Sequence, residues 1–241
     1  MVTLVFLIYI TNIDNKIYYV ALGDSLAAGQ TPYGEKTGYG YTDYVKDYLE
    51  KKDKLEVYTK GFAISGYRTT DLMRDINDNK KIKINDKSIS IKQALIKADI
   101  VTLSIGANDL FYKLGVTTKT VNLEDEESLY QYIDEIMKDM DQLLKLVRQY
   151  CKEDIILVGY YNPFSDQVSE NRDKYDNIFR YANEQYKKVC DRYKIHYVDI
   201  YNDFNSHKDY LPNPLDVHPS TQGYEAISKK VIKVIDKEVL N

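Results

Sequence analysis

The chain has 241 residues and a formal net charge of −4, with 44% hydrophobic and 29% charged residues. The net negative charge argues against a nucleic-acid-binding protein, because such a surface needs concentrated positive charge. The composition is typical of a soluble globular chain rather than a disordered or membrane-embedded one. No internal repeat or Pro/Gly-rich linker divides the sequence, so we expect one domain over residues 16–241.

The first segment, residues 1–15, contains the apolar run VTLVFLIYI at 2–10. This run is too short to span a bilayer and lacks the basic residues that open a typical export signal. It is the remnant of a signal or anchor, an added strand, or an artefact of the gene start. We favour the first interpretation, which predicts an extracellular or cell-surface protein rather than a cytoplasmic one. Any membrane contact is then expected through this segment only.

Short runs rich in Val, Ile and Tyr recur along the rest of the chain and predict strands. The five predicted strands lie at 16–23, 54–61, 99–106, 154–161 and 194–201. Between and after them, segments in which apolar residues return every three or four positions predict helices. The predicted helices lie at 41–52, 89–98, 127–150, 170–192 and 219–238. This alternation predicts an α/β fold in which helices cover both faces of a parallel sheet.

The lysine-rich stretch DNKKIKINDK at 78–87 is interrupted by aspartates and apolar residues, and we interpret it as a solvated loop or an edge hairpin.

The two cysteines, Cys151 and Cys190, lie in no C-x-x-C motif and beside no histidine. This placement argues against a metal site or a thiol nucleophile, and it leaves open whether the two cysteines form a disulfide.

Four loops that follow predicted strands contain residues suited to chemistry. Ligands of open parallel sheets bind beyond the carboxyl ends of the strands, so we expect these loops to converge in space. Their sequences are GDSLAAG (23–29), AISGYRTTDL (63–72), GANDL (106–110) and LPNPLDVHPS (211–220).

The first loop matches no phosphate-binding motif. A P-loop requires G-x-x-x-x-G-K-[ST], whereas five residues separate Gly23 from Gly29 and Gln30 stands in the place of the lysine. The dinucleotide motif G-x-G-x-x-G and the elbow G-x-S-x-G are also absent around Ser25. A nucleophilic serine remains, and Ser25 would then need a general base, an orienting acid and oxyanion donors.

The chain offers three histidines as the base. His196 lies inside a predicted strand, and His207 lies in the polar loop NDFNSHKD. His218 follows Asp216 by two residues and precedes Pro219, a typical start of a helix. Residues two apart in an extended segment face the same side, so one loop can present both a carboxylate and an imidazole. We therefore predict His218 as the base and Asp216 as the orienting acid.

Three groups are candidates to hold an oxyanion. Gly66 has no side chain, so its backbone N–H can approach a substrate closely. Asn108 follows a predicted strand and can direct its side-chain amide to the same point, and the backbone N–H of Ser25 adds a third donor.

Each of these residues also has a purely structural interpretation. Ser25 could cap a helix, and Asn108 with Asp109 could cap a helix that begins at Leu110. Gly66 could be an ordinary turn glycine and His218 could pack near the last helix, while Asp24 is interpreted as support for its turn. These interpretations require that all four blocks follow strands by chance.

Taken together, the blocks resemble those of the SGNH/GDSL hydrolases. GDSL (23–26), SGYRTTDL (65–72), GAND (106–109) and DVHPS (216–220) match the family's nucleophile, glycine, asparagine and histidine blocks, in order and over nearly the full length. The resemblance is strongest to the lysophospholipase-like bacterial esterases of the family. It implies a flavodoxin-like three-layer αβα sandwich around a parallel five-stranded sheet, and ester hydrolysis through an acyl-enzyme without a metal or a cofactor.

The resemblance places Ser25, Gly66, Asn108 and His218 in the roles argued above. The family's last block usually reads D-x-x-H, whereas Leu215 stands three residues before His218 here. Either Asp216 orients the imidazole from a different loop path, or another group such as a backbone carbonyl does so.

The sequence thus predicts a serine esterase that acts on small-molecule, lipid or glycan esters. Two hypotheses from another class remain beside it. The first is a flavodoxin-like module that binds phosphate or flavin without chemistry. The second is a catalytically silent protein of the same fold that binds glycans or lipids.

Overall fold

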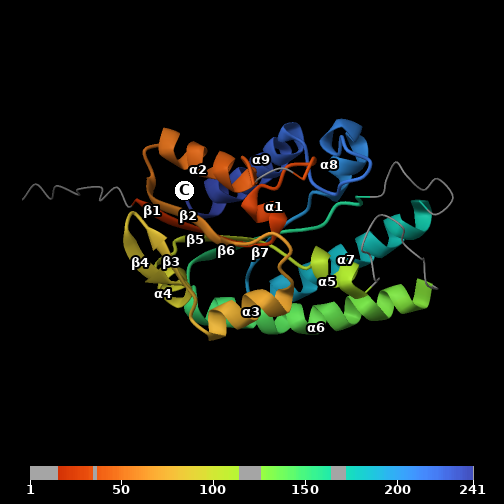
Figure 1. Cartoon of the computed structure of the whole chain (residues 1–241), viewed down its shortest axis with the longest axis horizontal. Helices are drawn as coiled ribbons and strands as arrows, with labels where there is room; N and C mark the ends of the chain where they lie inside the picture. Colours follow the sequence, from red (N-terminus) through yellow and green to blue (C-terminus); the bar gives the residue numbers. More distant parts are fainter. Residues whose placement is uncertain (1–15, 35–36, 114–125, 164–171, 241) are drawn as a thin grey trace, which may run out of the picture.

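The computed structural model describes residues 16–34, 37–113, 126–163 and 172–240. Its centre is a five-stranded parallel sheet in the order β2-β1-β5-β6-β7 (Figure 1). The strands are β1 (Ile17–Gly23), β2 (Leu55–Ala63), β5 (Ile100–Ser104), β6 (Asp154–Val158) and β7 (His196–Val198). Four of the five lie within segments predicted as strands, and β2 overlaps the predicted segment 54–61 and extends to Ala63.

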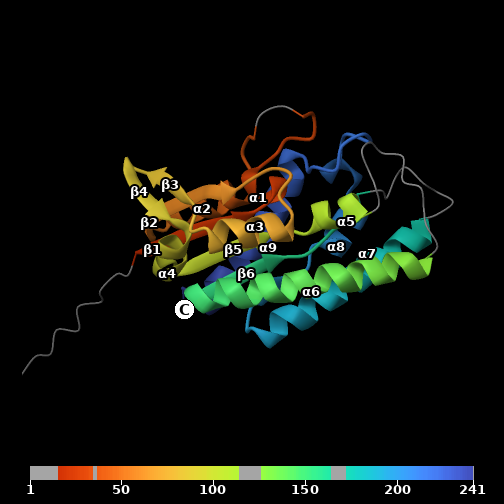
Figure 2. The same ribbon diagram turned by 60° about the horizontal axis from the view of Figure 1, so that its bottom comes forward.

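Helices cover both faces of this sheet, as Figures 1 and 2 show. One face carries α2 (Tyr41–Lys51), α8 (Tyr201–Ser206) and α9 (Thr221–Glu238). The other face carries α3 (Thr69–Asn77), α4 (Ile91–Lys97), α6 (Glu126–Tyr150) and α7 (Arg172–Arg192). The short helices α1 (Ser25–Ala28) and α5 (Ala107–Lys113) follow β1 and β5 directly. The predicted three-layer α/β fold is therefore confirmed.

The strands separate two hydrophobic cores, one on each face of the sheet. In β1, Val20 and Leu22 pack with the helices of one face, while Tyr19 and Ala21 pack with the helices of the other. All four side chains are fully buried. Successive residues of a strand point to opposite faces, so a strand buried on both faces is a continuous apolar run. This explains why the strands were visible in the sequence without an alternating pattern.

Two helix starts differ from the prediction because serine caps set them. The expected helix at 89–98 begins only at Ile91, since the hydroxyl of Ser90 accepts a hydrogen bond from the backbone N–H of Gln93. The last helix begins at Thr221 rather than at Pro219, since Ser220 caps it through the N–H of Gly223. A serine side chain at this position satisfies a backbone donor that the first turn leaves free.

The lysine-rich stretch forms a hairpin, which was one of its two interpretations. Strand β3 (Lys81–Ile84) pairs with β4 (Lys87–Ser90) in antiparallel register. The two residues between them, Asn85 and Asp86, both have positive φ. Such a pair is typical of a tight two-residue hairpin turn.

Residues 1–15, with their expected signal, anchor or strand, lie outside the described residues. Within the described part of the chain, no helix is long and apolar enough to cross a membrane.

Cys151 and Cys190 are both buried free thiols. Burial raises the pKa of Cys151 to about 11 and that of Cys190 to about 12, so both remain protonated at neutral pH.

Candidate active site

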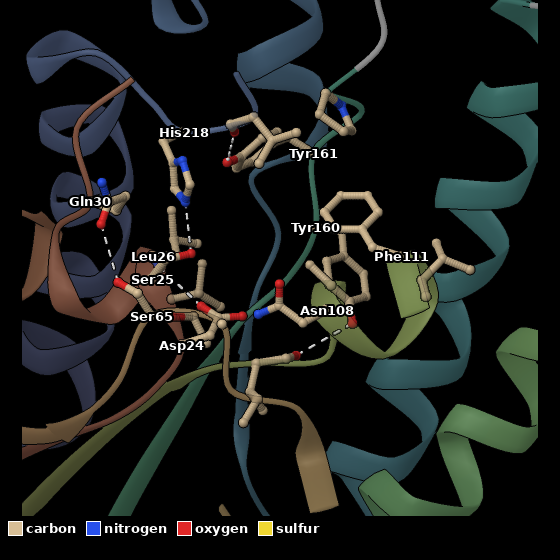
Figure 3. A pocket seen from close by; sticks show the side chains of 18 of the residues that line it. Asp24, Ser25, Leu26, Gln30, Ser65, Asn108, Phe111, Tyr160, Tyr161 and His218 are labelled. Carbon is tan, nitrogen blue, oxygen red and sulfur yellow. Dashed lines mark hydrogen bonds between the residues drawn. The ribbon is translucent and has the colours of Figure 1, made fainter. Parts of the chain in front are cut away.

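His218 lies within hydrogen-bonding distance of both Ser25 and Asp216, and Figure 3 shows its contact with Ser25. The Nε2 atom of His218 is 2.7 Å from the Oγ atom of Ser25. Its Nδ1 atom is 2.5 Å from the Oδ1 atom of Asp216. Residues separated by 193 positions in the chain thus form the arrangement of a nucleophile, a base and an orienting acid.

The turn that presents Ser25 depends on Gly23. This glycine has φ of +132°, and a Cβ atom at its position would overlap the carbonyl oxygen of Ser104 in β5. The backbone N–H of Asp24 donates to that same oxygen at 3.0 Å. Only a glycine allows β1 to leave the sheet so close to its neighbour, and Ser25 follows as the first residue of α1.

Asp24 is the N-cap of α1, which agrees with its interpretation as support for the turn. Its carboxylate accepts a hydrogen bond from the backbone N–H of Leu26 at 3.0 Å. Burial, together with the nearby charge of Asp109, raises the pKa of the Asp24 carboxyl to about 7. Asp24 also lines the cavity beside Ser25, so its charge at neutral pH is sensitive to what fills that cavity.

The His218 loop shows how a D-x-H spacing places a carboxylate beside the imidazole. The Oδ1 atom of Asp216 accepts the backbone N–H of His218 at 2.8 Å, while the imidazole Nδ1 approaches the same oxygen. A short side chain that bonds to the backbone two residues ahead forms a tight turn of this kind. Leu215, which stands at the family's usual acid position, is 77% exposed. In the structure, the carboxylate of Asp216 rather than a backbone carbonyl lies beside the Nδ1 atom of His218.

Asp216→Asn is expected to lower kcat by about 10³- to 10⁴-fold, because the amide would favour the wrong imidazole tautomer and leave the imidazolium unstabilised. The measurement is hydrolysis of a p-nitrophenyl ester, with Asp209→Asn as the control. Asp209 is an exposed acid in the same stretch between β7 and α9. A loss of less than tenfold in folded Asp216→Asn would show that another group orients His218.

The three predicted oxyanion donors face the same cavity. Ser25, Gly66 and Asn108 all line it. The backbone N–H of Ser25 belongs to the first turn of α1 and so has no acceptor within that helix. Gly66 has φ of +82°, a left-handed conformation that favours glycine. The side chain of Asn108 carries two N–H donors, of which one donates to the carbonyl of Tyr67 at 2.9 Å.

Hydrogen bonds between the glycine and asparagine loops fix these donors in place. Besides the bond from Asn108 to Tyr67, the carboxylate of Asp109 accepts from the backbone N–H of Thr69 at 2.9 Å and from its hydroxyl at 3.0 Å. Asp109 thereby satisfies the first turn of α3 from a different element. Burial raises the pKa of Asp109. Asn108 and Asp109 lie within the first turn of α5 and do not cap a helix that begins at Leu110.

The other two histidines have partners away from Ser25. The Nε2 atom of His196 is 2.8 Å from Asp154, the first residue of β6 and therefore at the opposite end of the sheet. The Nδ1 atom of His207 is 2.9 Å from the carbonyl of Asp203, and its ring stacks on Tyr210. Only His218 of the three touches the predicted nucleophile.

Tyrosines after β6 also belong to the site and were not predicted. The hydroxyl of Tyr161 donates to the carbonyl of Val217 at 2.6 Å, and its ring stacks on Phe204 at 4.2 Å. Tyr161 thus holds the residue between Asp216 and His218. The pair YY was included in the predicted strand 154–161, whereas β6 ends at Val158, and an aromatic pair at the end of a strand does not reveal its partner.

The site opens into a cavity of about 300 Å³. This volume lies at the lower end of the range for pockets that bind small molecules. The cavity is lined by residues from all four predicted loops and from the loop after β6.

The chain is similar in sequence and in fold to known proteins. The chain is 29% identical to the spore germination lipase LipC of Bacillus licheniformis, over 89% of this chain and 94% of that protein. It superposes on the lipase Lip_vut3 from a goat rumen metagenome with a TM-score of 0.68, at 25% identity, covering 89% of this chain and 95% of the other.

A third protein supports the fold alone. The acetylxylan esterase Axe2 of Geobacillus stearothermophilus superposes with a TM-score of 0.61 at 21% identity, covering 92% of this chain and 94% of the other. The family model of the GDSL-like lipases and acylhydrolases matches residues 21–226, from the end of β1 into α9. With the four blocks gathered at one end of the sheet, the chain belongs to the GDSL-like lipase/acylhydrolase family.

Proposed function

We propose that this carboxylic ester hydrolase works through an acyl-enzyme on Ser25. His218 takes the proton of the Ser25 hydroxyl as the oxygen attacks the ester carbonyl, and the carboxylate of Asp216 stabilises the imidazolium that forms. The backbone N–H groups of Ser25 and Gly66 and the amide of Asn108 hold the negative oxygen of the tetrahedral intermediate.

The intermediate collapses when the imidazolium of His218 gives its proton to the leaving alcohol, and the acyl group stays on Ser25. Water then enters, loses a proton to His218 and attacks the acyl carbonyl. The second intermediate releases the carboxylic acid, and the serine regains its proton from His218. Ser25, Gly66, Asn108 and His218 all line the cavity, and Asp216 contacts the Nδ1 atom of His218.

The observation that carries this proposal is the contact between Ser25 Oγ and His218 Nε2 at 2.7 Å, with Asp216 on the far side of the imidazole. A helix-capping serine needs no imidazole, and a phosphate-binding loop would need a cation that this loop lacks. A relative named as a lipase also supports ester hydrolysis.

Two esters with the same acyl group form the same acyl-enzyme, and this intermediate can be tested by how it divides between water and methanol as acceptors. The enzyme is given p-nitrophenyl butanoate or 1-naphthyl butanoate in buffer with methanol, and the ratio of methyl butanoate to butanoic acid is measured. We expect the same ratio from both esters, because the leaving group has departed before water or methanol reacts. A ratio that changes with the leaving group would contradict an acyl-enzyme. Reactions with Ser25→Ala supply the background to be subtracted.

A further inference from the structure

The cavity has two chemically different ends on either side of the reacting pair. Figure 3 shows Gln30 and Ser65 on one side of Ser25, and Phe111 and Tyr160 on the other. The hydroxyl of Ser65 donates to the side-chain oxygen of Gln30 at 3.2 Å, so this end is polar. The opposite end is formed by side chains that present carbon. An ester placed across Ser25 thus meets a polar region on one side of its carbonyl and an apolar region on the other.

Tyr160 contributes to the apolar end because its hydroxyl is bound elsewhere. The hydroxyl pairs with that of Tyr186 from α7, and it lies 3.4 Å from the carbonyl of Ile105. Tyr186 donates to the same carbonyl at 2.7 Å. Burial raises the pKa of both tyrosines well above the ordinary value, so both hydroxyls stay neutral. Because both hydroxyls form hydrogen bonds within the protein, a ligand in the cavity contacts the ring carbons of Tyr160.

The hydroxyls of Tyr160 and Tyr186 both lie against the backbone of Gly106. Gly106 has φ of +111°, and a Cβ atom there would overlap the hydroxyl oxygens of both Tyr160 and Tyr186. A glycine two residues after the end of β5 therefore lets two tyrosines bind the Ile105 carbonyl.

Asn183 of α7 holds the backbone of Tyr160. Its side-chain oxygen accepts the Tyr160 N–H at 2.8 Å, and its amide donates to the Tyr160 carbonyl at 3.0 Å. The hydroxyl of Tyr197 donates to the same side-chain oxygen at 2.7 Å. Asn183 is buried, and its two hydrogen bonds to the backbone of Tyr160 fix the loop after β6. The wall that Tyr160 forms is therefore preorganised.

Aliphatic and aromatic side chains complete the apolar end. The cavity lining also includes Ile105, Leu110, Pro163 and Phe179, of which Ile105 and Phe179 lie beside Tyr160. A sugar placed among them would bury hydroxyls without hydrogen-bond partners, which is unfavourable. A hydrocarbon chain needs no partner and gains free energy from leaving water.

The volume limits how long that chain can be. The cavity of about 300 Å³ is about twice the size of an apolar cavity that accommodates benzene, so it has room for roughly twelve non-hydrogen atoms. The ester group and part of the leaving group take about three or four of these. An acetyl group would leave the apolar end largely empty, and a chain of sixteen carbons would not fit.

We propose that the apolar end beside Ser25, walled by Tyr160 and Phe111, is an acyl-chain subsite that selects carboxylic esters with acyl groups of about six to ten carbons. This inference rests on the proposed function, because the subsite has a role only if the acyl group is transferred to Ser25. Phe111 is a specificity-determining residue, and Asn183 is a positioning residue that acts through Tyr160.

The test is kcat/KM for p-nitrophenyl esters with even chains from two to sixteen carbons, below their critical micelle concentrations. We expect kcat/KM to rise about two- to fourfold for each added methylene up to about eight carbons, because each buried methylene contributes transfer free energy. Beyond about ten carbons kcat/KM is expected to fall, since the added carbons no longer fit the cavity.

Two opposite changes at Phe111 sharpen the test. Phe111→Ala is expected to move the optimum to acyl groups longer by about two to four carbons, and Phe111→Trp is expected to move it to shorter ones. Tyr112→Ala is the matched control. Tyr112 is the next residue of α5, but it is 71% exposed and its ring packs against the guanidinium of Arg68 instead of lining the cavity. Its variant is expected to keep the wild-type optimum.

The outcomes separate the subsite from the reaction itself. Activity that depends on Ser25 but is highest on acetate, or equal from two to twelve carbons, would overturn the subsite and leave the esterase proposal intact. The absence of any ester hydrolysis that depends on Ser25 would overturn both. The wild-type profile alone decides the matter if a Phe111 variant fails to fold.

Discussion

Ser25→Ala is expected to lower kcat for ester hydrolysis by about 10⁵- to 10⁶-fold, because a methyl group cannot attack the carbonyl and the acyl-enzyme cannot form. The change removes one atom at the start of α1 and leaves the cap from Asp24 in place. The fold should therefore be preserved, and thermal unfolding should begin within a few degrees of the wild type. The measurement is hydrolysis of p-nitrophenyl butanoate and octanoate at saturating substrate.

Ser65→Ala is the matched control for this loss. Ser65 lines the same cavity, but its hydroxyl donates to Gln30 and has no imidazole beside it. Its variant is expected to retain kcat within about tenfold, the ordinary effect of losing a neutral hydrogen bond. A folded Ser25→Ala variant that keeps more than a hundredth of wild-type kcat would contradict the assignment of the nucleophile.

The second large effect is expected at His218. His218→Gln should lower kcat by about 10⁵- to 10⁶-fold, because glutamine can accept a hydrogen bond from Ser25 but cannot take its proton. The amide is close to imidazole in size, so the contact at 2.7 Å can be kept while the base is lost. Steady-state kinetics from pH 5 to 9 would check that no shift of optimum hides the loss.

His196→Gln and His207→Gln provide the controls. His196 pairs with Asp154 at the other end of the sheet, and His207 bonds to the carbonyl of Asp203. Both variants are expected to retain kcat within about threefold, as is usual for changes away from reacting atoms. Comparable losses in a folded His196 or His207 variant would show that His218 is not the base.

The sequence predicted the sheet and its convergent loops because their signals are local. Strands buried on both faces are continuous apolar runs, and Gly23, Asp24 and Ser25 form one turn whose geometry follows from neighbouring residues. The pairing of Ser25 with His218 could be predicted as well, since only three histidines were available and one followed a carboxylate by two residues.

The missed features depend on contacts between distant parts of the chain. Helix α3 has nine residues, and Asp109, 40 positions after Thr69, satisfies its first turn. Helix α8 has six residues, which is too short for a helical period to appear. Tyr160 becomes an apolar wall only because Asn183 and Tyr186 of α7 occupy its polar groups. No pattern near Tyr160 in the sequence indicates those partners.

The spacing around Asp216 shows the limit of motif comparison. A D-x-H block departs from the usual D-x-x-H, and the sequence left two interpretations of how the imidazole is oriented. One side-chain oxygen that binds both the backbone N–H and the ring of His218 brings the acid into place despite the shorter spacing. The geometry of such a turn depends on backbone torsions that the order of residue types does not specify.

Covalent labelling by an alkyl fluorophosphonate, followed by mass spectrometry of the digested protein, tests the activated serine most directly. The geometry predicts one phosphonyl group per chain on the peptide that contains Ser25. Labelling should be absent in Ser25→Ala and at least a thousandfold slower in His218→Gln, because the reagent reacts with a hydroxyl only when a base removes its proton. A folded wild-type protein that stays unlabelled, or that carries the label on another residue, would contradict the assignment of Ser25 as the nucleophile.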